Sequence, residues 1–331
     1  MLTFLMVTPE QQTSLMTMLR TCLCTFLFAL LTAPALAWGP IGHMAVAYGA
    51  YQSLTPATKA RVRDLLKLNP DYPEWNKQVP ASTSAADHDM IIFMIAATWA
   101  DDIKGDSKYS DDGPDPNAPN GASSSQNIGY TDLFRHRYWH FVDTPFPSDL
   151  PIPTPNAETQ IVAFRAVLAS SQPDGLKSYD IVWLLHLIGD VHQPLHAATR
   201  ITQSKGDAGG NAVKLFGDAA SNLHSYWDDL PGSDGSFCKD KIHCVNRAMV
   251  LGRSLKPASS KASHNTNTAA WIRESFDYAR TEVYKTPIGP GEGPYTIVPY
   301  SLYETRAFRL AEKRIALGGA RLAQVLNNEL K

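Results

Sequence analysis

The sequence predicts an all-α fold: a single, mostly helical domain with few short strands. Apolar residues recur at helical spacing in segment after segment, whereas few stretches alternate apolar and polar residues as a half-buried strand would. Strong helical patterns also resume on both sides of every loop rich in Gly, Pro, Asn and Asp, and the chain has no internal repeat. We therefore expect one domain over residues 38–331.

The expected helices follow one another along the chain. They cover residues 43–54, 56–68, 88–104, 157–171, 178–192, 218–229, 240–255, 267–284 and 301–329. Pro56 suits the first turn of its helix, and Thr55 is a suitable N-cap because its hydroxyl can accept a backbone N–H. Residues 105–129, 144–156 and 286–299 are expected to be loops, because Gly, Pro, Asn and Asp interrupt them repeatedly.

Residues 1–37 are expected to be a secretory signal peptide. Residues 19–33 form an apolar stretch that is too short to span a bilayer, and Ala35-Leu36-Ala37 has the small-x-small pattern of a cleavage site. A membrane anchor is the alternative, but no stop-transfer pattern follows. The mature chain then begins at Trp38, keeps no membrane anchor, and is exported, either secreted or periplasmic.

Charge and cysteine content restrict the possibilities further. The formal net charge of -2 excludes the broad basic surface typical of duplex-binding proteins, so local charge must hold any nucleic acid. Cys22 and Cys24 lie in the expected signal peptide, which leaves Cys238 and Cys244. In an exported protein such a close pair is expected to form a disulfide, with a zinc-binding pair as the less favoured alternative.

Histidines pair with carboxylates at helical spacing. His186 and Asp190 are four residues apart, which places them on one helix face where both can reach one metal ion, and His224 and Asp228 repeat this spacing. A single pair of this kind is more often a buried hydrogen bond or a surface ion pair. Several polar residues within apolar segments nevertheless need partners, and zinc satisfies histidine and aspartate together.

Asp101 and His140 extend this set, and no cysteine belongs to it. Structural zinc sites usually rest on thiolates, whereas catalytic sites use histidine and carboxylate ligands and keep a position open for water. A mixed set of this size favours several metal ions in an open centre suited to hydrolysis.

The remaining histidines divide into two groups. His192 and His196 are four apart, but Pro194 should end the helix between them, so we select His196 as a ligand and expect His192 to pack or to face solvent. The others lie in polar, loop-like surroundings and receive no role: His88, His136, His243 and His264.

Cleavage before Trp38 would itself create a metal ligand. A free α-amino group has a pKa of ~7.7–8.0, so its neutral form is accessible near neutral pH. The Trp38 amine and carbonyl oxygen can chelate one metal ion, and His43 could complete that site.

Taken together, these motifs resemble the secreted single-strand-specific zinc nucleases of fungi and plants, the S-one/P-one nucleases, which are relatives of the zinc-dependent phospholipases C. The motifs that carry the resemblance are "WGPIGH", "TWADDIK", "YWHFVD", "LLHLIGDVHQPLH", "GDAGGN" and "NLHSYWD", in the family's order, with a similar C-terminal tail containing "WIRES" and "GGARLAQVLN". The resemblance implies the all-α fold of that superfamily. The chain contains no Asn-x-Ser/Thr sequon, which fits a bacterial exported member.

The resemblance implies three zinc ions in one cleft. The first would be held by Asp101, His140, His186 and Asp190. The second would be held by the Trp38 amine and carbonyl, His43 and Asp190, so that Asp190 bridges the pair. The third would be held by His196, His224 and Asp228.

The resemblance also assigns catalytic and substrate-binding residues. Asp101 and Asp190 would act with the bridged pair, which lowers the pKa of a shared water, and Lys104 would face the phosphate. Phe141 would stack on a base and Asp143 would hydrogen-bond to it, with Asn211 on the polar side of the same pocket. Such a pocket suits an unpaired nucleotide.

The expected activity is therefore endonucleolytic cleavage of single-stranded DNA and RNA to 5′-phosphate products, with 3′-nucleotidase activity on 3′-mononucleotides. No obligate protein partner is expected. A zinc-dependent phospholipase C is the alternative enzyme, and a non-enzymatic secreted metal-binding protein is the second alternative. The base-pocket residues and "WGPIGH" favour the nuclease. The loops at 105–130 and 200–221 differ from the fungal pattern, and both bear on base preference and duplex tolerance.

Overall fold

The computed structural model describes residues 38–330 except for 112–131, 203–204, 218–219 and 231–237, so the expected signal peptide lies outside the described residues. The helices are α2 (Pro40–Ser53), α3 (Pro56–Leu66), α4 (Tyr72–Gln78), α5 (Ala85–Ala96), α6 (Trp99–Asp102), α7 (Ala157–Leu168), α8 (Asp174–Asp190), α9 (Leu223–Asp229), α10 (Lys241–Ser254), α11 (Ser260–Ser263), α12 (Thr268–Tyr278) and α13 (Leu302–Glu329). Short helical turns add η3 (Arg137–His140), η4 (Pro194–Ala197) and η5 (Ala279–Val283).

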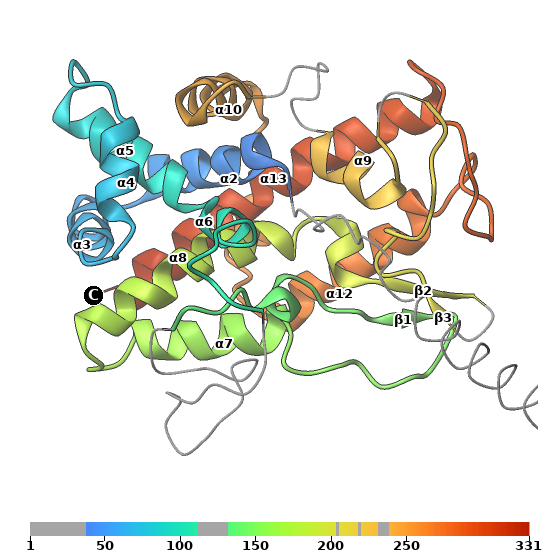
Figure 1. Ribbon diagram of the computed structural model, residues 1–331, viewed down its shortest axis with the longest axis horizontal. Coiled ribbons are helices and arrows are strands. Elements are labelled where there is room, and N and C mark those ends of the chain that lie inside the picture. Colours follow the sequence, from blue (N-terminus) through green and yellow to red (C-terminus); the bar gives the residue numbers. More distant parts are fainter. Residues whose placement is uncertain (1–37, 112–131, 203–204, 218–219, 231–237, 331) are drawn as a thin grey trace, which may run out of the picture. The chain divides into compact units, whose positions relative to one another are not determined.

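The hydrophobic core lies between α2, α8 and α13. Helix α2 packs along α13 and also contacts α5 and α10, while α7 lies beside α8 (Figure 1). Helix α8 is buried along nearly its whole length, from Leu176 to Asp190. Its polar side chains are therefore buried as well, and they need partners inside the protein. The all-α prediction is confirmed.

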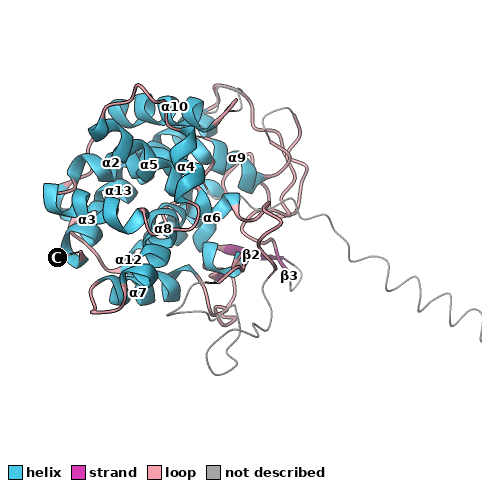
Figure 2. Cartoon of the chain, turned by 60° about the vertical axis from the view of Figure 1, so that its left-hand side comes forward, coloured by secondary structure: helices cyan, strands magenta, loops and turns pink. Residues whose placement is uncertain are grey.

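The three strands are short, as the sequence predicts. Strand β1 (Pro145–Phe146) pairs in parallel with β2 (Thr199–Thr202), and β2 pairs antiparallel with β3 (Lys205–Gly206). Figure 2 shows the strands and long loops on one side of the helices. Strand β1 lies within the expected loop at 144–156. It follows the η3 turn in the chain and pairs with β2 in space.

Local sequence signals fix several helix ends. The Thr55 hydroxyl accepts the Thr58 N–H at 3.1 Å, as expected for the cap of α3. Asn156 forms a capping box with Thr159 at the start of α7. Helix α8 ends at Asp190, and Pro194 begins η4, so the proline does separate His186 and Asp190 from His196.

The prediction of one helix over residues 88–104 is wrong. The helix stops at Ala96, and the Thr98 hydroxyl donates to the Ile95 carbonyl at 2.9 Å, which competes with the regular helical bonding. Asp101 therefore lies in the separate single turn α6 rather than at the end of a long helix. The short helices α4 and α11 were not predicted, because they are too brief to show a helical period.

The structure joins Cys238 and Cys244 in a disulfide, with their Cα atoms 5.3 Å apart. The bond encloses the first turn of α10. Among the helices that the structure describes, none has the length and apolar character needed to cross a membrane.

Candidate metal centre

Six separate elements bring eight histidine and aspartate side chains together. They are His43 from α2, Asp101 from α6, His140 from η3, His186 and Asp190 from α8, His196 from η4, and His224 and Asp228 from α9. Three groups of these side chains have ligand atoms close enough to hold a metal ion: His140, His186 and Asp190; His43, Asp101 and His186; and His196, His224 and Asp228. The first two groups share His186. Asp101 is the most accessible of them, with 10% of its side chain exposed, so solvent reaches the centre at this residue.

The first group surrounds a point between α6, η3 and α8. His140 Nδ1 lies 3.1 Å from Asp190 Oδ2 and 3.1 Å from His186 Nε2. Asp101 Oδ1 lies 3.6 Å from His186 Nε2. Ligands of a tetrahedral zinc ion with bonds of ~2.0–2.1 Å are about 3.3 Å apart, so these separations fit one zinc ion.

The two carboxylate oxygens of Asp190 face different histidines. Oδ2 lies beside His140 and His186, whereas Oδ1 lies 3.2 Å from His43 Nε2. A carboxylate in this position can bridge two metal ions. Helices α2 and α8 approach closely here: a Cβ on Gly189 would lie only 2.9 Å from His43 Nδ1. The absence of a side chain at Gly189 therefore leaves room for the His43 ring.

Trp38 lies next to this second group. Its side chain is fully buried, and the following Gly39 N–H donates to the Asp228 carbonyl at 2.9 Å. This bond joins the segment before α2 to α9, which carries Asp228 of the third group.

The third group is made of His196, His224 and Asp228. The two Nε2 atoms lie 3.1 Å apart, and His224 Nε2 lies 3.5 Å from Asp228 Oδ2. Each Nδ1 donates to a backbone carbonyl at 2.7 Å: His196 to His140 and His224 to Gly209.

These hydrogen bonds test whether a metal ion fits. Since the Nδ1 atoms of His196 and His224 carry the protons, neutral rings direct two Nε2 lone pairs at each other. His186 is fixed in the same way, because its Nδ1 donates to the Ala97 carbonyl at 2.8 Å. Facing lone pairs repel unless a cation lies between them, and carbonyl-oriented imidazoles are typical of zinc ligands. The residues present therefore fit zinc.

The electrostatics of most histidines agree with this assignment, although the pKa of His186 is raised, because its burial is outweighed by the carboxylates of Asp190 and Asp101. Burial lowers the pKa of His43 to about 4 and that of His224 to about 3. Burial and then Lys104 lower the pKa of His140 to about 3. Neutral imidazoles are the metal-binding form. Burial also raises the pKa of Asp228, although Gln193 donates to it at 2.7 Å, and a bound cation would favour its ionised form.

Lys104 contacts a residue of this centre directly, whereas the expected base-pocket residues are described by their position in the chain, their burial and their local contacts. Lys104 Nζ lies 2.6 Å from Asp101 Oδ1, and the Lys104 side chain is only 5% exposed. Phe141 directly follows His140 and is partly buried. Burial and the nearby Asp207 raise the pKa of Asp143 to about 6. Asn211 Nδ2 donates to the Ala208 carbonyl at 2.8 Å.

Sequence reasoning missed two supporting networks. His136 is fully buried rather than loop-like: its ring stacks on Trp139 at 3.6 Å, and its Nε2 lies 3.0 Å from Asp132. It precedes η3, which carries His140. The aromatic neighbours in "HRYWH" were the available signal.

His192 belongs to the other network. It packs inside the protein, where Arg321 lies 3.1 Å from its Nε2, and Arg314 donates to its carbonyl at 3.0 Å. Both arginines come from α13, more than a hundred residues away in the sequence, so no local pattern predicts these contacts.

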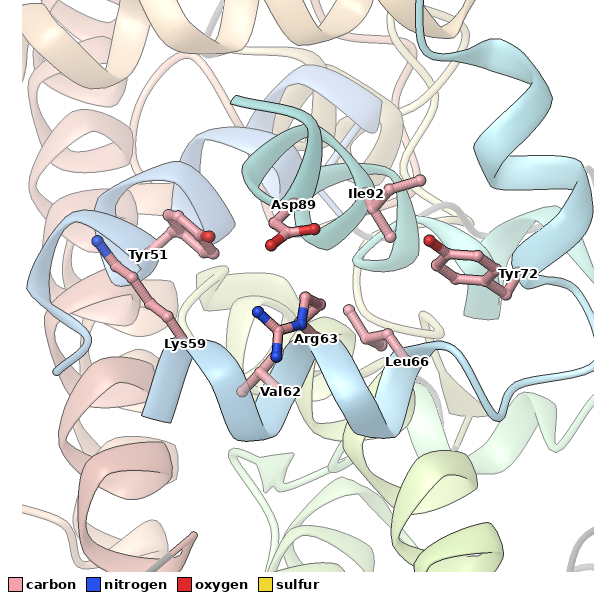
Figure 3. A pocket seen from close by; sticks show the side chains of 8 residues that line it. All are labelled: Tyr51, Lys59, Val62, Arg63, Leu66, Tyr72, Asp89 and Ile92. Carbon is pink, nitrogen blue, oxygen red and sulfur yellow. The ribbon is translucent and has the colours of Figure 1, made fainter. Parts of the chain in front are cut away.

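A separate hollow lies between α2, α3 and α5. Figure 3 shows Asp89 above Arg63, with the aromatic rings of Tyr51 and Tyr72 at the sides. Lys59 Nζ lies 4.7 Å from the centroid of the Tyr51 ring. No histidine lines this hollow, and none of its residues belongs to the metal centre.

Comparisons with known proteins find relatives that are named as nucleases. The chain is 32% identical to Endonuclease 3 of Arabidopsis thaliana over 158 residues, covering 44% of this chain and 50% of that protein. It is 32% identical to Endonuclease 5 of the same plant over 157 residues (44% and 49%). It is 27% identical to Nuclease S1 of Aspergillus oryzae over 202 residues (58% and 53%).

These matches span about half the length of the curated relatives. A model of the S1/P1 nuclease family, in contrast, matches residues 38–331, the whole chain from Trp38 onward. The chain therefore belongs to the S1/P1 nuclease family.

Proposed function

We propose that this protein is a trinuclear-zinc phosphodiesterase. It would cleave single-stranded DNA and RNA endonucleolytically to 5′-phosphate products and would remove 3′-phosphates from mononucleotides. The observation that carries the proposal is the buried pair His196 and His224: their Nε2 lone pairs face each other at 3.1 Å, and the Nδ1 of each donates to a backbone carbonyl. Family membership supports the same activity.

The proposed zinc ligands follow the three groups. Asp101, His140, His186 and Asp190 hold the first ion; the Trp38 amine and carbonyl, His43 and Asp190 hold the second; His196, His224 and Asp228 hold the third. The two oxygens of Asp190 face the first and second groups separately, which supports its role as the bridge.

When bound, zinc would supply Lewis acidity: it would polarise phosphate oxygens and lower the pKa of a bound water to near neutrality. The protein's own residues then orient the phosphodiester. Asp101 is the most exposed of the proposed ligands, and the Lys104 ammonium, 2.6 Å from its Oδ1, would bind a phosphate oxygen that approaches there. This cation matters because the chain as a whole has a formal net charge of -2.

Substrate selection would fall to the residues around the third group. Phe141 would stack on a base, while Asp143 and Asn211 would hydrogen-bond to its edge. Phe141 follows the ligand His140, and Asn211 follows the loop that supports His224, so both are tied to the metal centre through the backbone. A base must leave its duplex stack to be bound in this way, which favours single strands.

The protein would be exported. The disulfide fits an oxidising compartment, either the periplasm or the medium. Residues 1–37 would be removed as a signal peptide, leaving residues 38–331 as one zinc-dependent nuclease domain of a bacterial member, without an obligate protein partner.

Product analysis tests the proposal. The mature protein, loaded with zinc, is incubated with single-stranded DNA, single-stranded RNA, duplex DNA and phosphatidylcholine vesicles. We expect 5′-phosphorylated oligonucleotides from both single strands, slower duplex cleavage, and loss of activity with a chelator. Release of phosphocholine without nucleic acid cleavage would instead identify a phospholipase C, and no hydrolysis of any substrate would indicate a metal-binding protein.

A further inference from the structure

A buried aspartate outside the metal centre organises the loop at residues 207–211. Asp207 is 2% exposed and follows strand β3. Its Oδ1 accepts the backbone N–H of Arg200 at 2.9 Å and that of Gly210 at 3.2 Å, and its Oδ2 accepts the Tyr284 hydroxyl at 2.8 Å. One carboxylate therefore bonds to Gly210 within the turn and joins the turn to β2 and to Tyr284.

The turn between these contacts has an unusual backbone. Ala208, Gly209 and Gly210 have φ values of 51°, 59° and 85°, all in the left-handed region. A Cβ on Gly209 would lie 2.6 Å from the Leu195 carbonyl, so only glycine fits there. Such a backbone persists only where its surroundings hold it, and Asp207 supplies the side-chain contacts that do so.

This turn contacts a residue of the metal centre and also carries a proposed substrate-binding residue. The Gly209 carbonyl accepts the Nδ1–H of His224 at 2.7 Å. Asn211, the proposed base-binding amide, donates to the Ala208 carbonyl at 2.8 Å. A shift of the turn would therefore move a ligand-orienting carbonyl and a substrate-binding amide together.

A second loop is fastened at the same point. The guanidinium of Arg200 donates to the carbonyls of Gly289 at 2.6 Å and Gly291 at 2.8 Å, and its Nε lies 3.5 Å from Asp207 Oδ2. Arg200 thus joins Asp207, at the start of the loop at 207–211, to the loop at 285–295.

We propose that Asp207 is a positioning residue of the third metal pocket, acting through the Gly209 carbonyl on His224 and through the turn on Asn211. This inference rests on the proposed function. Removal of a group that orients a zinc-bound histidine typically lowers metal affinity about 10–100-fold. The first pocket should not respond, because its His186 is oriented by the Ala97 carbonyl instead.

The experiment compares Asp207→Ala and Asp207→Asn with the wild type. Metal-free mature protein is titrated with zinc alone, in competition with a chelator, and KM and kcat are measured on a single-stranded oligonucleotide. We expect one of three zinc ions to bind about 10–100-fold more weakly in Asp207→Ala. KM should rise as well, because Asn211 moves with the turn. Asp207→Asn keeps an acceptor for the two backbone N–H groups, so it should recover most of the affinity.

Asp240→Ala is the matched control. Asp240 also accepts a backbone N–H, that of His243 at 2.8 Å, but it caps α10 away from the turn. This variant should bind all three zinc ions as the wild type does. Tyr284→Phe removes only the contact to Oδ2 and should have an effect between those of the wild type and Asp207→Ala.

Three equally weakened zinc ions in Asp207→Ala would overturn the proposal, because Asp207 would then support the fold in general. Unchanged affinity and KM would overturn it as well. A wild-type protein that binds zinc but cuts no oligonucleotide would contradict the proposed function alone, since the zinc titrations of the variants would still measure the effect of Asp207 on the third pocket.

Discussion

The first and third proposed metal pockets contain similar side chains but differ in the contacts that hold those side chains in position. The first takes His186 and Asp190 from α8, a 17-residue helix whose surface is almost wholly buried. The third takes His196 from the four-residue η4 and both other ligands from the seven-residue α9. Short helices have little stability of their own, so contacts from outside must fix their position.

Those outside contacts are present at the third pocket. The Gly209 carbonyl, the His140 carbonyl and the Gln193 amide each bond one of its ligands. Two residues of the first proposed pocket are held by the packed helix α8, and its other two, Asp101 and His140, lie on the short elements α6 and η3. In the third proposed pocket all three residues lie on short helical elements and depend on these hydrogen bonds. Single substitutions outside the ligand set should therefore affect the third pocket more than the first. The predictions below test this difference, beginning with the largest expected effect.

Asp190→Asn should abolish hydrolysis and remove the zinc ions of the first and second pockets, because an amide cannot bridge two cations. Zinc content and oligonucleotide cleavage are the measurements. Asp180→Asn is the matched control on the same helix and should retain all three ions. Full activity with unchanged zinc content in Asp190→Asn would exclude Asp190 from the centre.

An added residue before Trp38 should prevent zinc binding in the second proposed pocket and leave the other two unchanged. It converts the α-amine into an amide, a poor ligand, and displaces the new terminus by up to ~3.6 Å. Protein that begins Met-Trp38 should fold, have weak activity and lack one zinc ion, whereas matched protein that begins at Trp38 should bind three. Equal zinc content in the two preparations would exclude the amine as a ligand.

Phe141→Ala should weaken binding of single strands by ~1–3 kcal/mol if one base stacks on this ring. Zinc content should not change, since Phe141 is not a ligand. An unchanged KM on oligonucleotides would show that the ring serves packing only.

Asp180 should make the free energy of unfolding of the protein depend on pH. Burial raises the pKa of its carboxyl to about 8 from 3.8, and within the described residues neither oxygen has a hydrogen-bond partner. The folded state keeps the proton that the unfolded chain releases above its ordinary pKa. Stability should therefore fall between pH 4 and pH 8, by up to ~1.4 kcal/mol per pH unit.

Chemical denaturation across this pH range measures the effect. Asp180→Asn cannot ionise, so its stability should decline less than that of the wild type as pH rises. Identical pH profiles for the two proteins would show that Asp180 does not carry the linkage.

The sequence predicted the fold class and most helices, because burial on one face leaves a period of 3.6 residues. It also selected ligands that the structure brings together, since His186 with Asp190 and His224 with Asp228 share helix faces. The break between α5 and α6 was not predicted. The hydrogen bond from the Thr98 hydroxyl to the Ile95 carbonyl competes with helical bonding there, and a single bond of this kind leaves no periodic pattern in the sequence.

Other features were unpredictable from sequence for a different reason. The contacts of Arg314 and Arg321 with His192 and of Asp207 with Tyr284 join residues that are far apart in the chain. They follow from tertiary packing, which leaves no periodic pattern. The supports of the metal centre were therefore harder to predict than its ligands.

Diffraction from crystals of the mature protein, recorded on both sides of the zinc absorption edge, tests the central claim most directly. Three anomalous peaks are expected: one among Asp101, His140, His186 and Asp190, one between His43, Asp190 and the Trp38 amine, and one among His196, His224 and Asp228. A fully zinc-loaded crystal without a peak at the third position, or with no pair of peaks bridged by Asp190, would contradict that claim.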